Sequence, residues 1–185
     1  MTVRYTLDPA PSRFTVQAFA GGMLSGLGHS PTFAIREFTG ELCFTPETGA
    51  DATFRLTVKA DSLTVTDSVS PKDREEIEGR MRREVLETAA NPEIVFQGTE
   101  ITAGKVADNW YRLRLNGELA LHGVKKPQPV DAQLRILDDQ VRLSGQCTLL
   151  LSAYRIKPVS ALGGMIKLKD ELKFDFDLVG RKAGA

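Results

Sequence analysis

Apolar and charged residues alternate without interruption near the end of the chain. Leu172, Phe174, Phe176 and Leu178 are apolar, and each intervening residue carries a charge. Successive side chains of a β-strand point to opposite faces, whereas a helix places every third or fourth residue on one face. The alternation therefore predicts a strand with one face in water and the other, which carries Phe174 and Phe176, turned toward an apolar interior.

The same period of two recurs along most of the chain and predicts about eight strands. The other segments lie at residues 14–18, 38–44, 54–60, 94–96, 111–121, 130–136 and 141–151. Turns separate them, and residues 123–129 are expected to form one of these turns. Many strands joined by turns are typical of a sandwich or an up-and-down barrel, and we favour an all-β, antiparallel, eight-stranded barrel. No repeat or linker indicates a second domain, so residues 1–185 are expected to form a single domain.

One segment, from Pro71 to about Thr88, has helical spacing instead. Ser70 can cap its first turn, and proline suits the first helical position. Asn91 and Pro92 end the pattern. One apolar stripe runs along this otherwise charged segment, formed by Ile77, Met81 and Val85. We expect one inserted helix, after the third or fourth strand, that lies against an opening or flank of the sheet.

Charge excludes some partners. The 24 Lys and Arg residues balance 24 Asp and Glu residues, so the formal net charge is zero. A neutral chain has no global positive field to hold nucleic acid. RNA-binding sheets set aromatic side chains beside basic ones, whereas Phe174 and Phe176 alternate with acids that repel phosphate. We therefore expect no nucleic-acid partner. No apolar run is long enough for stable membrane insertion.

The N-terminus lacks the basic segment followed by an apolar one that marks a signal peptide. The sequence thus favours a cytoplasmic protein, with a periplasmic location left open if the natural N-terminus has been replaced. Cys43 and Cys147 lie within alternating segments and form no CxxC pair. This favours two reduced, partly buried thiols over a disulfide.

Candidate catalytic groups are few. The two histidines are His29, in a glycine-rich loop, and His122, at a strand end. Metal sites use several ligands at fixed spacing, and neither HxH nor HExxH occurs. The nucleophile motif GxSxG and the phosphate-binding loop are absent as well. We expect no catalytic residues and no metal, with local hydrogen bonds as the role of both histidines and a shared metal or head-group site as the alternative.

The apolar face itself is the remaining feature. Eight of the nine phenylalanines lie in strands or beside them. Core packing explains each of them taken singly. An eight-stranded barrel, however, is about the size that either fills with side chains or encloses one small ligand. Periodicity alone leaves both interpretations open.

Several short motifs occur in an order that resembles the YceI-like family of lipid- or polyisoprenoid-binding proteins. The resemblance extends over about residues 3–182. The segments that carry it are Tyr5-x-Leu-Asp8, Ser12-Arg-Phe-x-Val16, Gly28-His29-Ser30, Phe38-x-Gly40-x-Leu42-x-Phe44, Arg74-x-x-Ile77, Val85-Leu86-Glu87, Pro92-Glu93-Ile94-x-Phe96, Gly117-x-Leu119-x-Leu121-His122-Gly123-Val124 and Leu168-Lys169-Asp170-Glu171-Leu172. Many family members are exported, and many carry Thr-Arg where this chain has Lys125-Lys126.

The resemblance implies a lipocalin-like barrel that holds a long amphiphile in its lumen. The expected partner is a small molecule with a long apolar tail, such as a polyisoprenoid, a quinone-like lipid or a fatty-acid derivative, and no other cofactor is expected. The expected contacts are the inward residues of the strands, with the helix stripe and residues 154–165 as mouth or lid. The residues chosen are Phe14, Val16, Phe33, Phe38, Leu42, Phe54, Met81, Phe96, Leu119, Leu121, Tyr154, Ile156, Met165, Phe174 and Phe176.

Two alternatives from other classes stay open. The first is a metal-dependent or other enzyme that uses His29 and His122. The second is a packed structural or interaction barrel without a ligand. A homodimer is compatible with all three.

Overall fold

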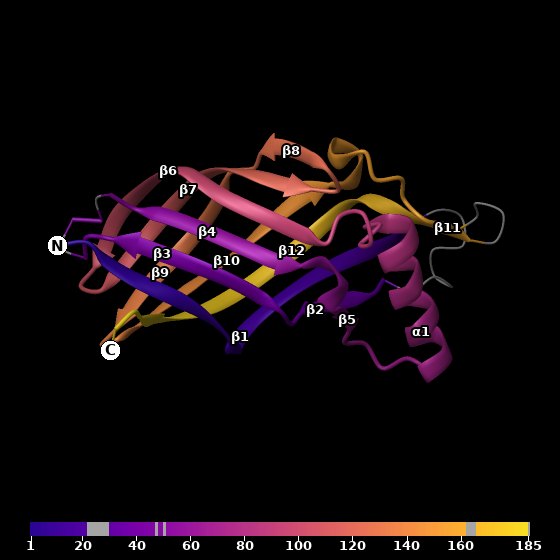
Figure 1. Ribbon diagram of the computed structural model, residues 1–185, viewed down its shortest axis with the longest axis horizontal. Coiled ribbons are helices and arrows are strands. Elements are labelled where there is room, and N and C mark those ends of the chain that lie inside the picture. The colour runs from indigo at the N-terminus through magenta and orange to yellow at the C-terminus, as the bar shows by residue number, and fades with distance from the viewer. Residues whose placement is uncertain (22–29, 47, 50, 162–165, 185) are drawn as a thin grey trace.

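Eight long strands close into one antiparallel barrel (Figure 1). The computed structural model describes residues 1–21, 30–46, 48–49, 51–161 and 166–184. Each barrel strand pairs with its neighbour in the order β12, β10, β9, β7, β6, β4, β3, β1, and β12 pairs back onto β1. This confirms the predicted eight-stranded barrel. The strands are β1 (Val3–Gly21), β3 (Phe38–Phe44), β4 (Thr53–Lys59), β6 (Glu93–Ala107), β7 (Trp110–Leu121), β9 (Val130–Leu137), β10 (Gln140–Leu150) and β12 (Ile166–Lys182).

Four short strands extend the barrel at its edges. β2 (Thr32–Ile35) pairs with β1, and β5 (Leu63–Val65) pairs with β2. β8 (Val124–Pro127) pairs with β7, and β11 (Ser160–Ala161) pairs with β12. The helix α1 (Pro71–Arg80) follows β5, after the third barrel strand, and lies across one end of the barrel (Figure 1).

The helix begins where its sequence predicts. Ser70 Oγ accepts a hydrogen bond from the backbone N–H of Asp73 at 3.1 Å. After Arg80 the helix continues as one π-helical turn, Met81–Val85, in which the N–H of Leu86 donates to the carbonyl of Met81 at 2.9 Å. The helical segment ends at Val85, close to the expected end near Thr88, and Glu87 stops it with a left-handed backbone at φ of 47°.

Polar contacts hold the helix to the small β2–β5 ribbon. Glu78 accepts a hydrogen bond from the N–H of Val65 at 3.0 Å and pairs with Arg82 at 3.1 Å. Arg74 donates to the carbonyls of Val65 and Asp67. These bonds fix one face of the helix, so its apolar stripe can face the barrel.

Replacing the cap tests how much of the helix depends on it. Ser70→Ala should destabilise the first turn by about 1 kcal/mol, because one helix N–H loses its acceptor. Hydrogen exchange of the α1 amides measures this loss as faster exchange. Ser68→Ala, at an exposed position just before the helix, is the control. Equal protection in both variants would contradict the capping role.

One end of the barrel is packed solid, and both chain termini lie there (Figure 1). The rings of Tyr5 and Phe44 stack with centroids 5.5 Å apart. Leu42 and Leu134 are 1% and 2% exposed. The sequence prediction missed the start of β1, although Val3, Tyr5 and Leu7 alternate with polar residues, because two prolines break the pattern before Phe14. The strand accommodates them with a register shift between Asp8 and Arg13.

The prediction of a turn at residues 123–129 is wrong for most of this segment. Val124–Pro127 is the strand β8, which continues the pairing onto β7. The turn is only two residues long, His122 and Gly123, with φ of 52° and 70°. Two successive positive φ values match the right-handed twist of a tight hairpin. Gly123 favours this turn, and His122 tolerates it.

Candidate functional site

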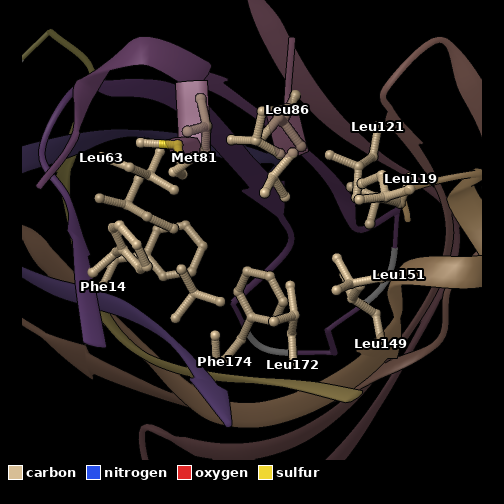
Figure 2. Close-up of a pocket in the computed structure, with 18 of the residues that line it drawn as sticks. Phe14, Leu63, Met81, Leu86, Leu119, Leu121, Leu149, Leu151, Leu172 and Phe174 are labelled. Carbon is tan, nitrogen blue, oxygen red and sulfur yellow. The ribbon is translucent and has the colours of Figure 1, made fainter. Parts of the chain in front are cut away.

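The other half of the barrel is hollow. A cavity of about 410 Å³ lies there, a volume typical of pockets that bind small molecules. Apolar side chains from strands all around the barrel form most of its wall (Figure 2). Several of them face inward yet remain only half-buried, among them Phe14, Leu119, Leu172 and Phe174. They are half-buried because they border open space, unlike Leu42 and Leu134.

The helix contributes one wall of the cavity. The apolar stripe Ile77, Met81 and Val85 lines it, as does Leu86. Figure 2 shows Met81 and Leu86 at this wall. In the part of the chain that the structure describes, the charged residues on the wall are Asp73, Glu76 and Arg80, all from α1. Arg80 pairs with Glu76 at 3.6 Å. Among the described residues, charge therefore borders the cavity only along the helix.

Strand β12 has the orientation that its alternation predicts. Leu172, Phe174, Phe176 and Leu178 all line the cavity. The intervening acids point outward and find basic partners. Asp177 pairs with Arg142, and this hydrogen-bonded guanidinium holds the pKa of the Asp177 carboxyl below its usual value.

Two glycines set the shape of the wall. A Cβ on Gly117 would lie 2.5 Å from the ring of Phe96, and a Cβ on Gly145 would lie 2.7 Å from the ring of Phe176. Such distances are well inside van der Waals contact. The absent side chains leave room for both rings to lie close to the wall.

The structure brings most of the chosen residues together. Those on the cavity wall are Phe14, Val16, Phe33, Phe54, Met81, Phe96, Leu119, Leu121, Ile156, Phe174 and Phe176. That they contact a ligand stays a prediction. Further wall residues that the sequence selection missed include Leu56, Leu63, Leu115, Cys147, Leu149, Leu151, Leu168 and Leu172. Most of them belong to the same alternating pattern, which could have identified them.

Three chosen residues are not on the cavity wall. Phe38 lies behind Phe14, with ring centroids 6.0 Å apart, and Leu42 belongs to the packed end. Tyr154 is 2% exposed and packs in the core. Alternation shows which face a residue takes, but not how far along the barrel it lies, and the hollow occupies only part of that length. Met165 lies outside the described residues.

Cys147 places a thiol on the cavity wall. Burial raises its pKa to about 11, because a thiolate is poorly solvated there. Both cysteines are free thiols, as the sequence predicted. The folded protein keeps the Cys147 proton in the pH range between the ordinary thiol pKa and about 11, where the unfolded chain loses it. The contribution of this thiol to stability therefore falls as pH rises through that range.

Cys147 should react slowly with iodoacetamide near neutral pH. We expect labelling at least tenfold slower in the folded protein than in urea, because the thiolate is the reactive species and is disfavoured by burial. Peptide mass spectrometry distinguishes Cys147 from Cys43. Equal rates in the folded and unfolded protein would show that the thiol is not buried as described.

His122 takes part in local hydrogen bonds. Its Nδ1 lies 3.2 Å from the carbonyl oxygen of Tyr154, and its Nε2 contacts the carboxylate of Glu87. His29 lies outside the described residues, so the alternative of a site shared by the two histidines stays untested. Within the described ranges, no group of three or more His, Cys, Asp or Glu residues could hold a metal ion. No described helix has the length and hydrophobicity to cross a membrane.

Comparison with known proteins gives one family and several similar structures. The YceI-like domain matches residues 5–180. A polyisoprenoid-binding domain from Saccharophagus degradans, implicated in plant cell wall breakdown, is 14% identical, with a TM-score of 0.70 over 97% of this chain and 99% of that one. BcnA from Burkholderia cenocepacia is 16% identical, with a TM-score of 0.67 over 94% and 98%.

A YceI protein from Campylobacter jejuni is 12% identical, with a TM-score of 0.62 over 82% of this chain and 84% of that one. At these identities the likeness shows a shared fold. A search of curated proteins gives no match.

Proposed function

The chain belongs to the YceI-like family, and from that premise we propose that its barrel binds one long-chain amphiphile for storage, transport or sequestration. The ligand class is a polyisoprenoid, a quinone-like lipid or a fatty-acid derivative. The observation that carries the proposal is the cavity of about 410 Å³, whose wall is apolar except beside the helix and at a few edge positions. The polyisoprenoid-binding domain from Saccharophagus degradans has the same fold, which supports this ligand class.

The distribution of polar groups orients the ligand. Asp73, Glu76 and Arg80 border the cavity along α1, so a polar head group would lie there, in contact with water. The apolar tail would fill the hollow below. A methylene group is about the size of a water molecule, which takes up about 30 Å³. The cavity therefore holds on the order of ten to fifteen carbon atoms.

Transfer of the tail from water supplies the binding free energy. Each buried methylene contributes about 0.8 kcal/mol, so ten to fifteen carbons give on the order of 8–12 kcal/mol. Ordering a flexible chain and losing its translational freedom oppose a large share of this gain. Such binding depends on length more than on chemical detail.

We propose a binding role rather than a catalytic one. Cys147 is a nucleophile on the described wall, and its raised pKa keeps it protonated at neutral pH. His122 is occupied by Tyr154 and Glu87. The described residues thus bring no base to the thiol, which a catalytic cysteine requires.

A series of primary alcohols of increasing chain length tests the proposal. Affinity should rise by up to about fourfold for each added methylene, which corresponds to about 0.8 kcal/mol, and should level off once the cavity is full. Displacement of a fluorescent fatty-acid probe measures it. An affinity that does not depend on length, or no binding of any alcohol or polyprenol, would overturn the proposal.

A further inference from the structure

The barrel wall is interrupted between β8 and the end of β10. β10 pairs with β9 from Gln140 to Gly145, but residues 146–150 pair only with β12, on their other side. On the facing side, β8 pairs with β7. Among the described strand pairings, none joins β8 to β10. We call this gap in the ladder, between residues 124–127 and residues 146–150, the seam.

Two prolines keep the ladder from resuming beyond its last pair. β8 and β9 pair with β7 in the same register. Gln128 lies between these two strands, and its N–H donates to the carbonyl of Gly117 on β7 at 2.8 Å. Successive residues of a strand direct their backbone groups to opposite sides. The backbone nitrogens of Pro127 and Pro129 therefore face β10, and proline has no N–H to donate.

Among the described residues, two side-chain hydrogen bonds bridge the seam, one at each end. Gln128 Nε2 donates to the carbonyl of Thr148 at 3.3 Å. At the other end, His122 Nδ1 lies 3.2 Å from the carbonyl oxygen of Tyr154. Two such hydrogen bonds contribute about 1 kcal/mol each, far less than a continuous backbone ladder. The seam is therefore a weak line in the described wall.

The cavity reaches the seam from inside. Leu119 and Leu121 line the cavity on the β7 side of the seam, and Leu149 and Leu151 line the cavity on its β10 side. Figure 2 shows these four leucines on one side of the cavity, across from Leu63, Met81 and Phe14. On the outer surface, Leu150 is 49% exposed at the edge of the seam. Apolar side chains thus lie on both faces of the wall at the seam, with Leu149 and Leu151 inside and Leu150 outside.

We propose that the seam is a side opening through which the tail of a ligand too long for the cavity leaves the barrel. This inference rests on the proposed function and extends it to chain length. A long tail cannot continue along the barrel axis, because the far end is packed around Leu42 and Leu134. Parting the leucines at the seam breaks no backbone hydrogen bond between β8 and β10, and the emerging chain meets Leu150.

A cross-link across the seam tests the proposal. If the β9–β10 ladder continued for five more residues past the pair of Gly145 and Ala132, it would place Leu150 opposite Pro127. Both positions are exposed, so P127C/L150C adds thiols outside the cavity, in a background of C43S/C147S. A short bis-maleimide then joins the two edges. The matched control is T102C/R114C, two exposed residues that face each other in the continuous β6–β7 ladder.

Farnesol and solanesol, a short and a long isoprenoid alcohol, are the probes. Each protein is compared with itself before cross-linking, by displacement of a fluorescent fatty-acid probe. Closing the seam should weaken solanesol binding at least tenfold and change farnesol binding less than twofold. The control cross-link should change neither. The double variant P127V/P129V, which restores both N–H donors toward β10, should cause the same selective loss.

The outcomes separate this inference from the proposed function. Unchanged solanesol binding after closure, or an equal loss for both alcohols, would overturn the side opening while leaving a lipid-binding barrel. If the unmodified protein binds neither alcohol, the proposed function fails and the side opening fails with it.

Discussion

Leu172→Trp is expected to lower the affinity for a long-chain alcohol by about 100-fold. Leu172 is half-buried on β12 and points into the hollow (Figure 2). The larger ring would occupy space that the ligand tail otherwise fills. Excluding three or four methylenes removes about 3 kcal/mol of binding free energy, and each 1.4 kcal/mol is a factor of ten.

The same substitution should barely affect folding. Because the ring enters existing apolar space, we expect the free energy of unfolding to stay within about 1 kcal/mol of the wild-type value, unlike overpacking of a filled core. Probe displacement and urea unfolding measure the two effects. Leu137→Trp, at a position 54% exposed on the outer surface, is the matched control and should change neither. Full affinity in Leu172→Trp would mean that the ligand does not occupy the hollow.

Leu134→Ala is expected to have the opposite profile. Leu134 is 2% exposed and lies opposite Tyr111 on one side and Leu143 on the other. Removing its methyl groups leaves a void in tightly packed surroundings, which costs about 2–5 kcal/mol of stability. Affinity for the alcohol series should change less than twofold, because Leu134 is not on the cavity wall.

The matched control is the same truncation in the hollow half. Leu172→Ala removes methyl groups that already border open space, so it should destabilise the fold by less than about 1.5 kcal/mol. Urea unfolding of both variants measures the difference. Similar losses at the two positions would contradict a barrel that is packed at one end and hollow at the other.

Local patterns predicted orientation well. The alternation on β12 requires Phe174 and Phe176 to face inward, because a shift of one residue would expose both rings. Ser70 and Pro71 mark the helix start for a similar local reason. Ser70 accepts a hydrogen bond from an otherwise unpaired backbone N–H, and Pro71 has no N–H that would need a partner. These features depend on residues close together in the chain.

The position of the hollow could not be predicted in this way. Phe38 and Leu42 face inward as the alternation requires, but they lie outside the cavity wall. Whether an inward side chain meets another side chain or empty space depends on strands that are distant in sequence. The rings of Phe96 and Phe176 lie back against Gly117 and Gly145, and no single strand reveals that arrangement.

The segment predicted as a turn contains two prolines. Residues 123–129 are expected to form a turn, yet residues 124–127 are a strand. A proline can occupy a strand whose N–H side lacks a partner. The two prolines of this segment keep the β9–β10 ladder from resuming, so the segment predicted as a turn is the one that forms the seam.

Native mass spectrometry of gently purified protein tests the central claim most directly. The claim is that the hollow half of the barrel holds one apolar chain. We expect a bound species whose extract in organic solvent is an amphiphile with a long tail, or, for protein purified empty, uptake of one added polyprenol per chain. No lipid in the extract and no uptake of added polyprenol would contradict the claim.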